Sequence, residues 1–251
     1  MIKAIFFDID GTILNGNKGI PNSTLLALDK LRQKGIKTII CTGRGYSEVK
    51  PLNLKGFDDY ILLNGQICYD DNDNIVFKKP IKDKEKLIKL FNSKKFPFGL
   101  IDEKETYLNC IDDYVKSVHD SINLTMPVVK EYDGGDIYQA LAYGKVKDYI
   151  EKELPDFIAT SWHFDGVDIV PKDSGKDKGI IEYCKLRYID IKDTMAFGDG
   201  ENDIEMLKTV GIGVAMGNSI DMVKENADYI TDRIEDDGLY KALRHYEAID
   251  D

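Results

Sequence analysis

The sequence predicts an α/β protein in which an α+β domain interrupts a core built around a parallel sheet. Short apolar runs alternate with helical patterns at both ends of the chain, which is typical of parallel sheets covered by helices on both faces. Between residues 81 and 171 the pattern changes to hairpins and separate helices. We therefore predict a discontinuous core domain of residues 1–80 and 172–251 and an inserted domain of residues 81–171.

The core begins with an apolar run over residues 2–7, which predicts a buried strand. Leucines at helical spacing then precede Gly35, and a second apolar run covers residues 36–41, so the three segments predict a βαβ unit. The next elements expected in the core are a helix over 46–55, a strand over 60–63, and a hairpin of 66–70 with 75–79.

The inserted domain is expected to combine helices with short strands. Its predicted elements are a helix over 83–95, two strands within 97–110, a helix over 112–122, strands over 127–132 and 136–143, a helix over 145–153, and a hairpin over 157–170. The core pattern then returns, with helices over 177–186, 202–209 and 219–226 and strands over 194–198, 211–215 and 228–230.

Composition excludes several classes of protein. The formal charge is 34 − 45 = −11, and such an acidic surface disfavours binding to nucleic acid. The apolar run Ala4–Phe7 is too short for a signal peptide and no segment is long enough for a membrane span, so we expect a cytoplasmic protein without a membrane partner. The spacing of Cys41, Cys68, Cys110 and Cys184 predicts reduced thiols rather than disulfides or a zinc site. The oligomeric state is not indicated.

Two carboxylates follow the first predicted strand. Asp8 and Asp10 are two residues apart, so extended backbone would point both to the same side, roughly 7 Å apart. Ligands of open α/β sheets bind at the carboxyl ends of strands. A carboxylate there can hold a hard cation or attack an electrophile, and a second carboxylate can transfer a proton. Alone, however, an Asp-x-Asp-Gly sequence is more typical of a polar turn.

Two further loops offer groups that suit a phosphate. Thr42, Gly43 and Arg44 follow the second predicted strand directly, and they supply a hydroxyl, backbone amides and a guanidinium. The polar loop Lys172–Gly179 opens a predicted helix, where a lysine could bind phosphate and neutralise a carboxylate. Alone, each loop is more typical of a solvated surface, and the three lysines of the second loop leave the choice among them open.

A fourth cluster crowds acids together after a predicted apolar strand. Asp199, Glu201 and Asp203 lie within five residues, and like charges at this spacing repel unless a cation or hydrogen bonds compensate. An EF-hand loop requires a longer series of oxygen ligands that closes with a glutamate, and Glu205 comes too early for that. A divalent cation shared with Asp8 explains the crowding better.

Together, the order of these clusters and their placement at predicted strand ends resemble the haloacid dehalogenase superfamily of phosphotransferases. The resemblance runs from Asp8 to Asp203, and the segment Gly213–Asn218 fits as well. The chain is most similar to the Cof-type branch (subclass IIB, C2-type cap), whose cap domain is inserted between the second and third motifs. The resemblance implies a Rossmann-like parallel-sheet core, a cap that determines substrate specificity, and an Mg²⁺-dependent phosphatase that acts through a phospho-aspartyl intermediate.

The resemblance also implies roles for the acidic residues. Asp8 falls on the nucleophile of the family, and Asp10 falls on the general acid/base. The Asp8 carboxylate, the Asp10 backbone carbonyl and Asp199 are expected to hold Mg²⁺. Asp203 is expected to support the metal through its waters.

Other matching residues are expected to bind the phosphate. Thr42 and the Gly43 amide correspond to the phosphate-binding second motif, and Arg44 completes the Thr-Gly-Arg of this branch and could reach the substrate. Asn202 is expected to contact the phosphate or to orient the lysine of the third motif.

The lysine of the third motif is assigned to Lys176. The family has a lysine, two intervening residues and a short apolar pair, and Lys176–Ile180 matches that spacing. Lys178 is the alternative, because the Asp173–Gly175 lead-in departs from the usual glycine-first pattern.

These residues predict a phosphomonoesterase that acts on a small phosphorylated metabolite, either a sugar phosphate or a phosphorylated cofactor. One alternative is a sugar phosphomutase on the same scaffold. A non-catalytic phospholigand sensor is another, although retention of both Asp8 and Asp10 argues against it because binding alone needs no acid/base. Trp162 and His163 are interpreted as residues of an ordinary strand in the inserted domain, and the identity of the substrate stays open.

Overall fold

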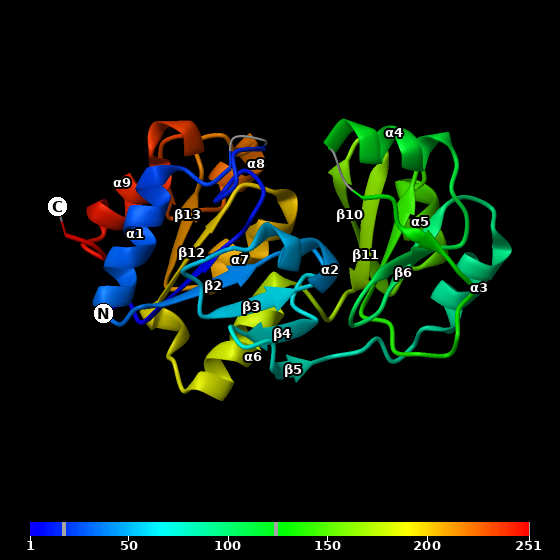
Figure 1. Cartoon of the computed structure of the whole chain (residues 1–251), viewed down its shortest axis with the longest axis horizontal. Helices are drawn as coiled ribbons and strands as arrows, with labels where there is room; N and C mark the ends of the chain where they lie inside the picture. The colour runs from blue at the N-terminus through cyan, green and yellow to red at the C-terminus, as the bar shows by residue number, and fades with distance from the viewer. Residues whose placement is uncertain (17–18, 123–124, 251) are drawn as a thin grey trace. The chain divides into compact units, whose positions relative to one another are not determined.

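The computed structural model describes residues 1–16, 19–122 and 125–250 (Figure 1). The chain divides into two compact units. The core unit comprises Met1–Gly43, Asn53–Phe77 and Gly175–Asp251, and the inserted unit comprises Arg44–Leu52 and Lys78–Ser174. The predicted fold class, a parallel-sheet α/β core with an inserted α+β domain, is confirmed.

The division differs from the predicted boundaries in two respects. The inserted unit runs from Lys78 to Ser174 rather than over 81–171, a shift of three residues at each end. Arg44–Leu52, which was expected to belong to the core, groups with the inserted unit. The segment lies between two core strands in the sequence, which is why it was expected in the core, but its Cα neighbours place it in the inserted unit.

The core unit contains one mixed sheet. Its strands are β1 (Ala4–Phe7), β2 (Lys37–Cys41), β3 (Asp59–Leu62), β4 (Ile67–Asp70), β5 (Ile75–Lys78), β12 (Thr194–Gly198), β13 (Ile212–Ala215) and β14 (Tyr229–Ile230). They lie in the order β14, β13, β12, β1, β2, β3, β4, β5. The strands from β14 to β3 are mutually parallel, and β4 is antiparallel to β3.

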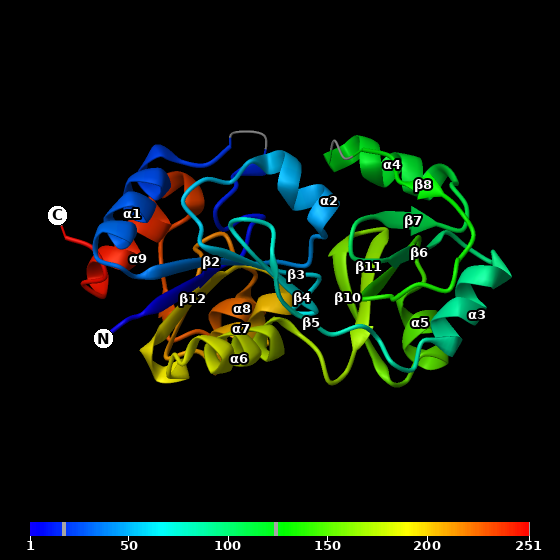
Figure 2. The same cartoon turned by 60° about the horizontal axis from the view of Figure 1, so that its bottom comes forward.

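Helices cover both faces of the core sheet. In Figure 2, α6 (Lys176–Arg187), α7 (Ile204–Thr209) and α8 (Asp221–Lys224) lie together on one side, whereas α1 (Asn22–Gln33) and α9 (Gly238–His245) lie side by side on the other. Alternate residues of β1 serve the two faces: Phe6 packs in the same cluster as Ile180 and Met206, and Phe7 stacks on Phe197. Helix α9 was not among the predicted elements.

The strand register brings several loops to one edge of this sheet. Phe7, the last residue of β1, pairs with Ile40 of β2 and with Phe197 of β12. The residues that follow these strands therefore emerge together at the carboxyl edge, where ligands of parallel sheets bind. β1 is completely buried, and its apolar residues hold the start of the Asp8 loop inside the core.

The inserted unit has its own sheet and core. Its strands are β6 (Phe98–Ile101), β7 (Thr106–Leu108), β8 (Val128–Val129), β9 (Gln139–Tyr143), β10 (Phe157–His163) and β11 (Gly166–Pro171). They lie in the order β10, β11, β9, β6, β7, β8, with antiparallel neighbours except for the parallel pair β7–β8.

Helices of the inserted unit are α2 (Tyr46–Val49), α3 (Glu85–Ser93), α4 (Asp113–Ile122) and α5 (Lys147–Glu153), with the 3₁₀ turn Lys50–Leu52 after α2. Side chains of α3 and α5, such as Phe91 and Ile150, pack with Leu100 and Ile169 of the sheet. Trp162 lies on β10, as expected, and its ring meets Tyr143 edge-on.

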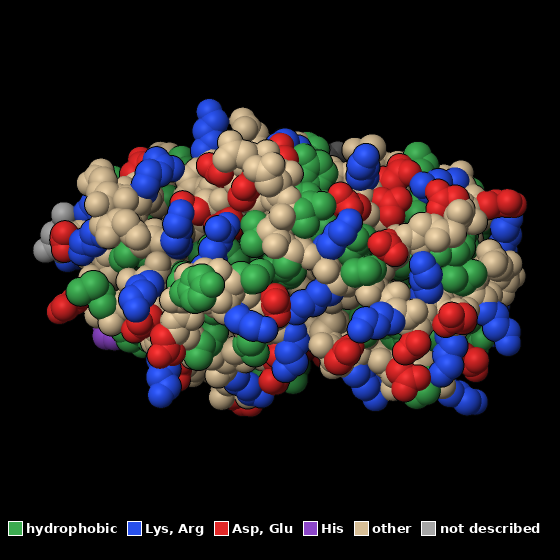
Figure 3. Space-filling view, turned by 90° about the horizontal axis from the view of Figure 1, so that it is seen from below, with side chains coloured by type: hydrophobic (Ala, Val, Ile, Leu, Met, Phe, Trp, Pro, Cys, Tyr) green, Lys and Arg blue, Asp and Glu red, His purple; other side chains and the backbone are tan. Residues whose placement is uncertain are grey.

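The surface is charged and of mixed sign. On the face shown in Figure 3, Lys and Arg side chains are interspersed with Asp and Glu side chains. Cys41, Cys68, Cys110 and Cys184 are all free thiols, as predicted. Within the described residues, no helix combines the length and the apolar character needed to cross a membrane.

Candidate active site

The centre of the site is a buried lysine that bridges two acids. Lys176 is the first residue of α6, and its side chain is 0% exposed. Its Nζ donates hydrogen bonds to Oδ1 of Asp8 at 2.6 Å and to Oδ1 of Asp203 at 2.5 Å. A buried ammonium is tolerated when it is paired and hydrogen-bonded in this way. The arrangement therefore fixes a positive charge against the Asp8 carboxylate.

Burial and ion pairing together determine the charge states of Lys176 and Asp8. Burial lowers the pKa of Lys176, but the carboxylates of Asp203 and Asp8 more than offset this and raise the pKa, so the lysine stays protonated. Burial, together with the charges of Asp203 and Asp199, raises the pKa of Asp8 to about 8, although the charge of Lys176 opposes that rise. Positive charge beside Asp8 thus favours the ionised carboxylate.

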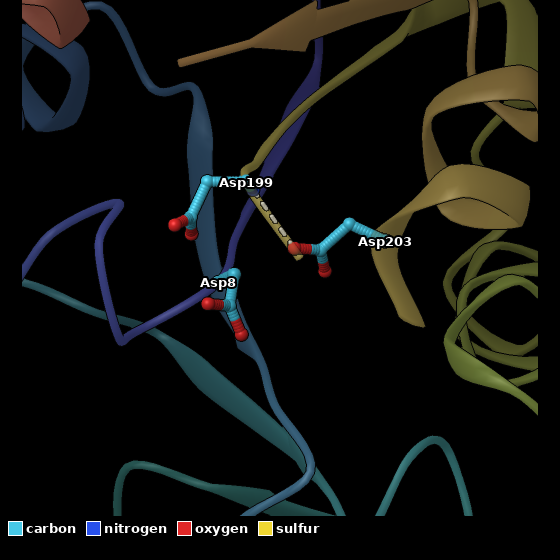
Figure 4. A group of neighbouring side chains, drawn as sticks. All are labelled: Asp8, Asp199 and Asp203. Atoms are coloured by element: carbon cyan, nitrogen blue, oxygen red, sulfur yellow. Dashed lines mark hydrogen bonds between the residues drawn. The ribbon is translucent and has the colours of Figure 1, made fainter. Parts of the chain in front are cut away.

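Asp203 holds both the lysine and the loop that carries Asp199. It is fully buried, and its Oδ1 accepts from Lys176. Its Oδ2 accepts the backbone N–H groups of Asp199 and Gly200, each at 2.9 Å, and Figure 4 shows the bond to Asp199. Three donors thus engage the two oxygens of Asp203, which ties Lys176 to the loop that carries Asp199.

Asp199 is held by two side chains that were not among the predicted site residues. Thr12 Oγ1 donates to Asp199 Oδ1 at 3.1 Å, and Asn218 Nδ2 donates to Asp199 Oδ2 at 3.2 Å. Asn218 also donates to the Gly11 carbonyl at 2.8 Å, which ties the β13 side of the sheet to the Asp8 loop. Burial, followed by the charge of Asp203, raises the pKa of Asp199 to about 7.

The arrangement of the acids fits a hard divalent cation. One carboxylate oxygen from each of Asp8, Asp199 and Asp203 lies within 4.8 Å of the others, and Figure 4 shows the Asp203 carboxylate directed toward the other two. Oxygen donors are the ligands that Mg²⁺ prefers. Burial is the main cause of the raised pKa of Asp8 and of Asp199, and the charges of neighbouring acids raise both further, so a bound cation would favour the ionised carboxylates.

Asp10 lies on the loop that follows Asp8. Asp10 is exposed to solvent, whereas Asp8 is buried. The charge of Asp10 contributes to the raised pKa of Asp199. The loop is closed by a backbone bond from Gly11 to the Leu14 carbonyl at 3.0 Å. The structure thus places Asp10 near the acidic group but with access to solvent, an environment different from that of Asp8.

The residues predicted to bind phosphate are divided between the two units. Thr42 directly follows β2 and is buried, and Gly43 after it is half-buried. Both lie in the core unit with Asp8, whereas Arg44 falls in the inserted unit. The side chain of Asn202, a half-buried residue of the core unit, donates to Asn64 Oδ1 at 2.9 Å.

The structure separates the two candidate lysines of the third motif. Lys178 has a side chain that is 51% exposed and pairs with Asp177 at 2.9 Å. Lys176, by contrast, points into the protein and reaches Asp8. The helical turn from Lys176 to Lys178 directs the two side chains to different surroundings, and Lys176 is the one at the acidic group.

Comparison with known proteins identifies the family. A model of the haloacid dehalogenase-like hydrolases matches residues 5–243. YkrA of Bacillus subtilis (strain 168) is 34% identical over 251 residues, which cover 96% of each chain. The solved structure of the phosphatase BT1666 from Bacteroides thetaiotaomicron has a TM-score of 0.90 and 31% identity, covering 99% of this chain and 96% of that one.

The structure of a subclass IIB sugar phosphatase, BT4131, has a TM-score of 0.86 and 30% identity, covering 98% of this chain and 100% of that one. Similarity to these proteins extends over both units, since each alignment spans nearly the whole chain. The chain therefore belongs to the haloacid dehalogenase-like hydrolases, in the Cof-type branch of subclass IIB, and is a hydrolase of the phosphatase type.

Proposed function

We propose that the protein is an Mg²⁺-dependent phosphomonoesterase that acts on a small phosphorylated metabolite through a phospho-aspartyl intermediate at Asp8. The observation that carries this proposal is the buried contact of 2.6 Å between Lys176 Nζ and Asp8 Oδ1. A carboxylate that attacks a phosphate must be ionised and must overcome the repulsion between two anions. The fixed ammonium of Lys176 favours both conditions.

In the first step, an oxygen of the Asp8 carboxylate forms a bond to phosphorus as the bond from phosphorus to the leaving oxygen breaks. Asp10 transfers a proton to that leaving oxygen, a role that suits a carboxyl group with access to solvent. Thr42, Gly43 and Asn202 are assigned to hold the non-bridging phosphate oxygens.

In the second step, water attacks phosphorus and gives a proton to Asp10. The bond from phosphorus to the Asp8 oxygen breaks, inorganic phosphate is released, and both carboxyl groups return to their starting states. The same acid/base thus serves both halves of the reaction, as the reversal of roles requires.

Asp8, Asp199 and the backbone carbonyl of Asp10 are assigned as the residues that would hold Mg²⁺. When bound, the ion supplies positive charge that stabilises the transferring phosphoryl group. Asp203 serves this site indirectly, because its oxygens already hold Lys176 and the amides of Asp199 and Gly200.

The substrate is proposed to be a sugar phosphate or a phosphorylated cofactor, with specificity set by the inserted unit. Support comes from the similarity over the whole chain to the subclass IIB sugar phosphatase BT4131. The formal net charge of −11 also disfavours nucleic acid as a ligand.

The first prediction concerns the nucleophile. Asp8→Asn keeps the size of the side chain and removes the nucleophilic carboxylate, so turnover of p-nitrophenyl phosphate should fall on the order of 10³-fold or more. Asp29→Asn, at an exposed carboxylate on α1, is the matched control and should retain full activity. Circular dichroism checks that both variants are folded. Turnover by folded Asp8→Asn at the wild-type rate would rule out this residue as nucleophile.

A second prediction concerns the metal. EDTA should abolish release of inorganic phosphate from the wild type, and excess Mg²⁺ should restore it, because the acidic group needs a counter-ion to accept a dianion. Mg²⁺ should also raise the melting temperature of the wild type but not that of Asp199→Asn. Turnover that persists in EDTA would refute the metal requirement. Conversion of a sugar phosphate into its positional isomer, without release of inorganic phosphate, would instead indicate a mutase.

A third prediction concerns the close approach of the Asp8 loop to Asp199. Gly11 has a φ of +77°, and a Cβ at this position would overlap the Asp199 carboxylate. Gly11→Ala should therefore displace Asp199 and lower kcat/KM by about 10²-fold.

Gly16→Ala is the matched control for Gly11→Ala. Gly16 also has a positive φ, +48°, yet a Cβ there would meet none of the described atoms within 4 Å. This substitution should cost some stability but leave kcat/KM within about threefold of the wild type. Equal effects of the two substitutions on kcat/KM would show that backbone strain, and not the contact with Asp199, is responsible.

A further inference from the structure

The turn between β3 and β4 has an unusual backbone. Leu63, Asn64 and Gly65 all have a positive φ, at 53°, 50° and 91°. Residues other than glycine rarely adopt a positive φ, although asparagine tolerates it better than most. A non-glycine residue keeps this conformation only where the surrounding structure holds it. The Leu63 side chain is buried, which anchors the turn in the core.

Asn64 is bonded to two of the loops assigned to the phosphate. Its side chain is buried, with the residue 4% exposed, and its Oδ1 accepts from Asn202 Nδ2 at 2.9 Å. Its backbone N–H donates to the Thr42 carbonyl at 3.0 Å. One residue of the turn therefore connects the loop after β2 with the loop after β12.

The same turn also fixes the start of α6. A Cβ on Gly65 would overlap the carbonyl oxygen of Gly175 and would lie 3.0 Å from the Gly179 nitrogen. Lys176, which follows Gly175, begins the helix at this close contact. The turn thus contacts all three segments that carry Thr42, Asn202 and Lys176.

We propose that Asn64 is a positioning residue of the phosphate site, acting through Asn202. The amide nitrogen of Asn202 carries two hydrogens, and the bond to Asn64 engages one of them. That bond fixes the plane of the amide, so the direction of the second N–H is fixed as well. The second N–H is then held ready for a phosphate oxygen, without Asn64 itself touching the substrate. The inference rests on the proposed function, which assigns Asn202 to the phosphate.

Asn64→Gly tests this role without adding strain, because glycine accepts the positive φ and lacks only the amide side chain. The dissociation constant of inorganic phosphate, measured by calorimetry in the presence of Mg²⁺, should rise about tenfold, as expected for a lost hydrogen bond to a charged group. KM for p-nitrophenyl phosphate should rise by a similar factor, while kcat changes less than about threefold.

The matched control is Asn53→Gly. Asn53 also has a positive φ, 47°, but it is exposed, so its replacement makes the same chemical change at a surface position. This variant should bind phosphate like the wild type. A melting curve for each variant sets a temperature at which all are folded, which separates lost stability from lost binding.

A double-mutant cycle tests whether Asn64 acts through Asn202. If it does, Asn64→Gly should have almost no further effect on phosphate affinity in an Asn202→Ala background. Additive effects, or an Asn64→Gly variant with wild-type phosphate affinity, would overturn the proposal. So would a loss confined to kcat.

The outcomes also separate this proposal from the proposed function. Phosphate binding without turnover by the wild type would count against the phosphatase and leave the Asn64 cycle intact as a test. Normal turnover with an unaffected Asn64→Gly variant would count against Asn64 alone. Failure of the wild type to bind phosphate would overturn the role of Asn64 at a phosphate site, whereas turnover of the phosphomonoester decides the proposed function.

Discussion

The structure of the site depends on the burial of Lys176 between Asp8 and Asp203. An ammonium with a fully buried side chain must be paired, and removal of one partner of such a group typically costs about 3–5 kcal/mol because a charge is left uncompensated. The second carboxylate oxygen of Asp203 accepts hydrogen bonds from the backbone amides of Asp199 and Gly200. The position of Asp199 therefore depends on the same residue that holds the lysine.

The strand order of the core sheet brings the residues around Lys176 together from distant parts of the chain. β1, β2 and β12 are adjacent and parallel, so Asp8, Thr42 and Asp199 emerge at one edge of the sheet. Helix α6 then inserts Lys176 from one face, where glycine at position 65 permits close contact with the start of the helix. The result is a fixed array of charges that requires little rearrangement when a phosphate binds.

Much of this arrangement could be predicted from the sequence because apolar runs that end in acids mark the strand ends. What the sequence could not provide is strand order and long-range contact. Asn64 showed only a turn pattern, and its bond to Asn202 joins residues 138 positions apart. Likewise, Asn218 acquires a role only once β13 is placed beside β12. Helix α9 was not predicted, although Leu239, Ala242 and Leu243 have helical spacing and are buried on one side of the helix.

The central claim is that the phosphoryl group passes through Asp8, and trapping of the intermediate tests it most directly. Enzyme mixed with a ³²P-labelled phosphomonoester would be quenched in acid within one turnover, digested, and its labelled peptide identified by mass spectrometry. The account predicts label on the peptide that contains Asp8, sensitive to hydroxylamine as an acyl phosphate should be. Stoichiometric release of phosphate with no labelled protein, or label on another residue, would contradict it.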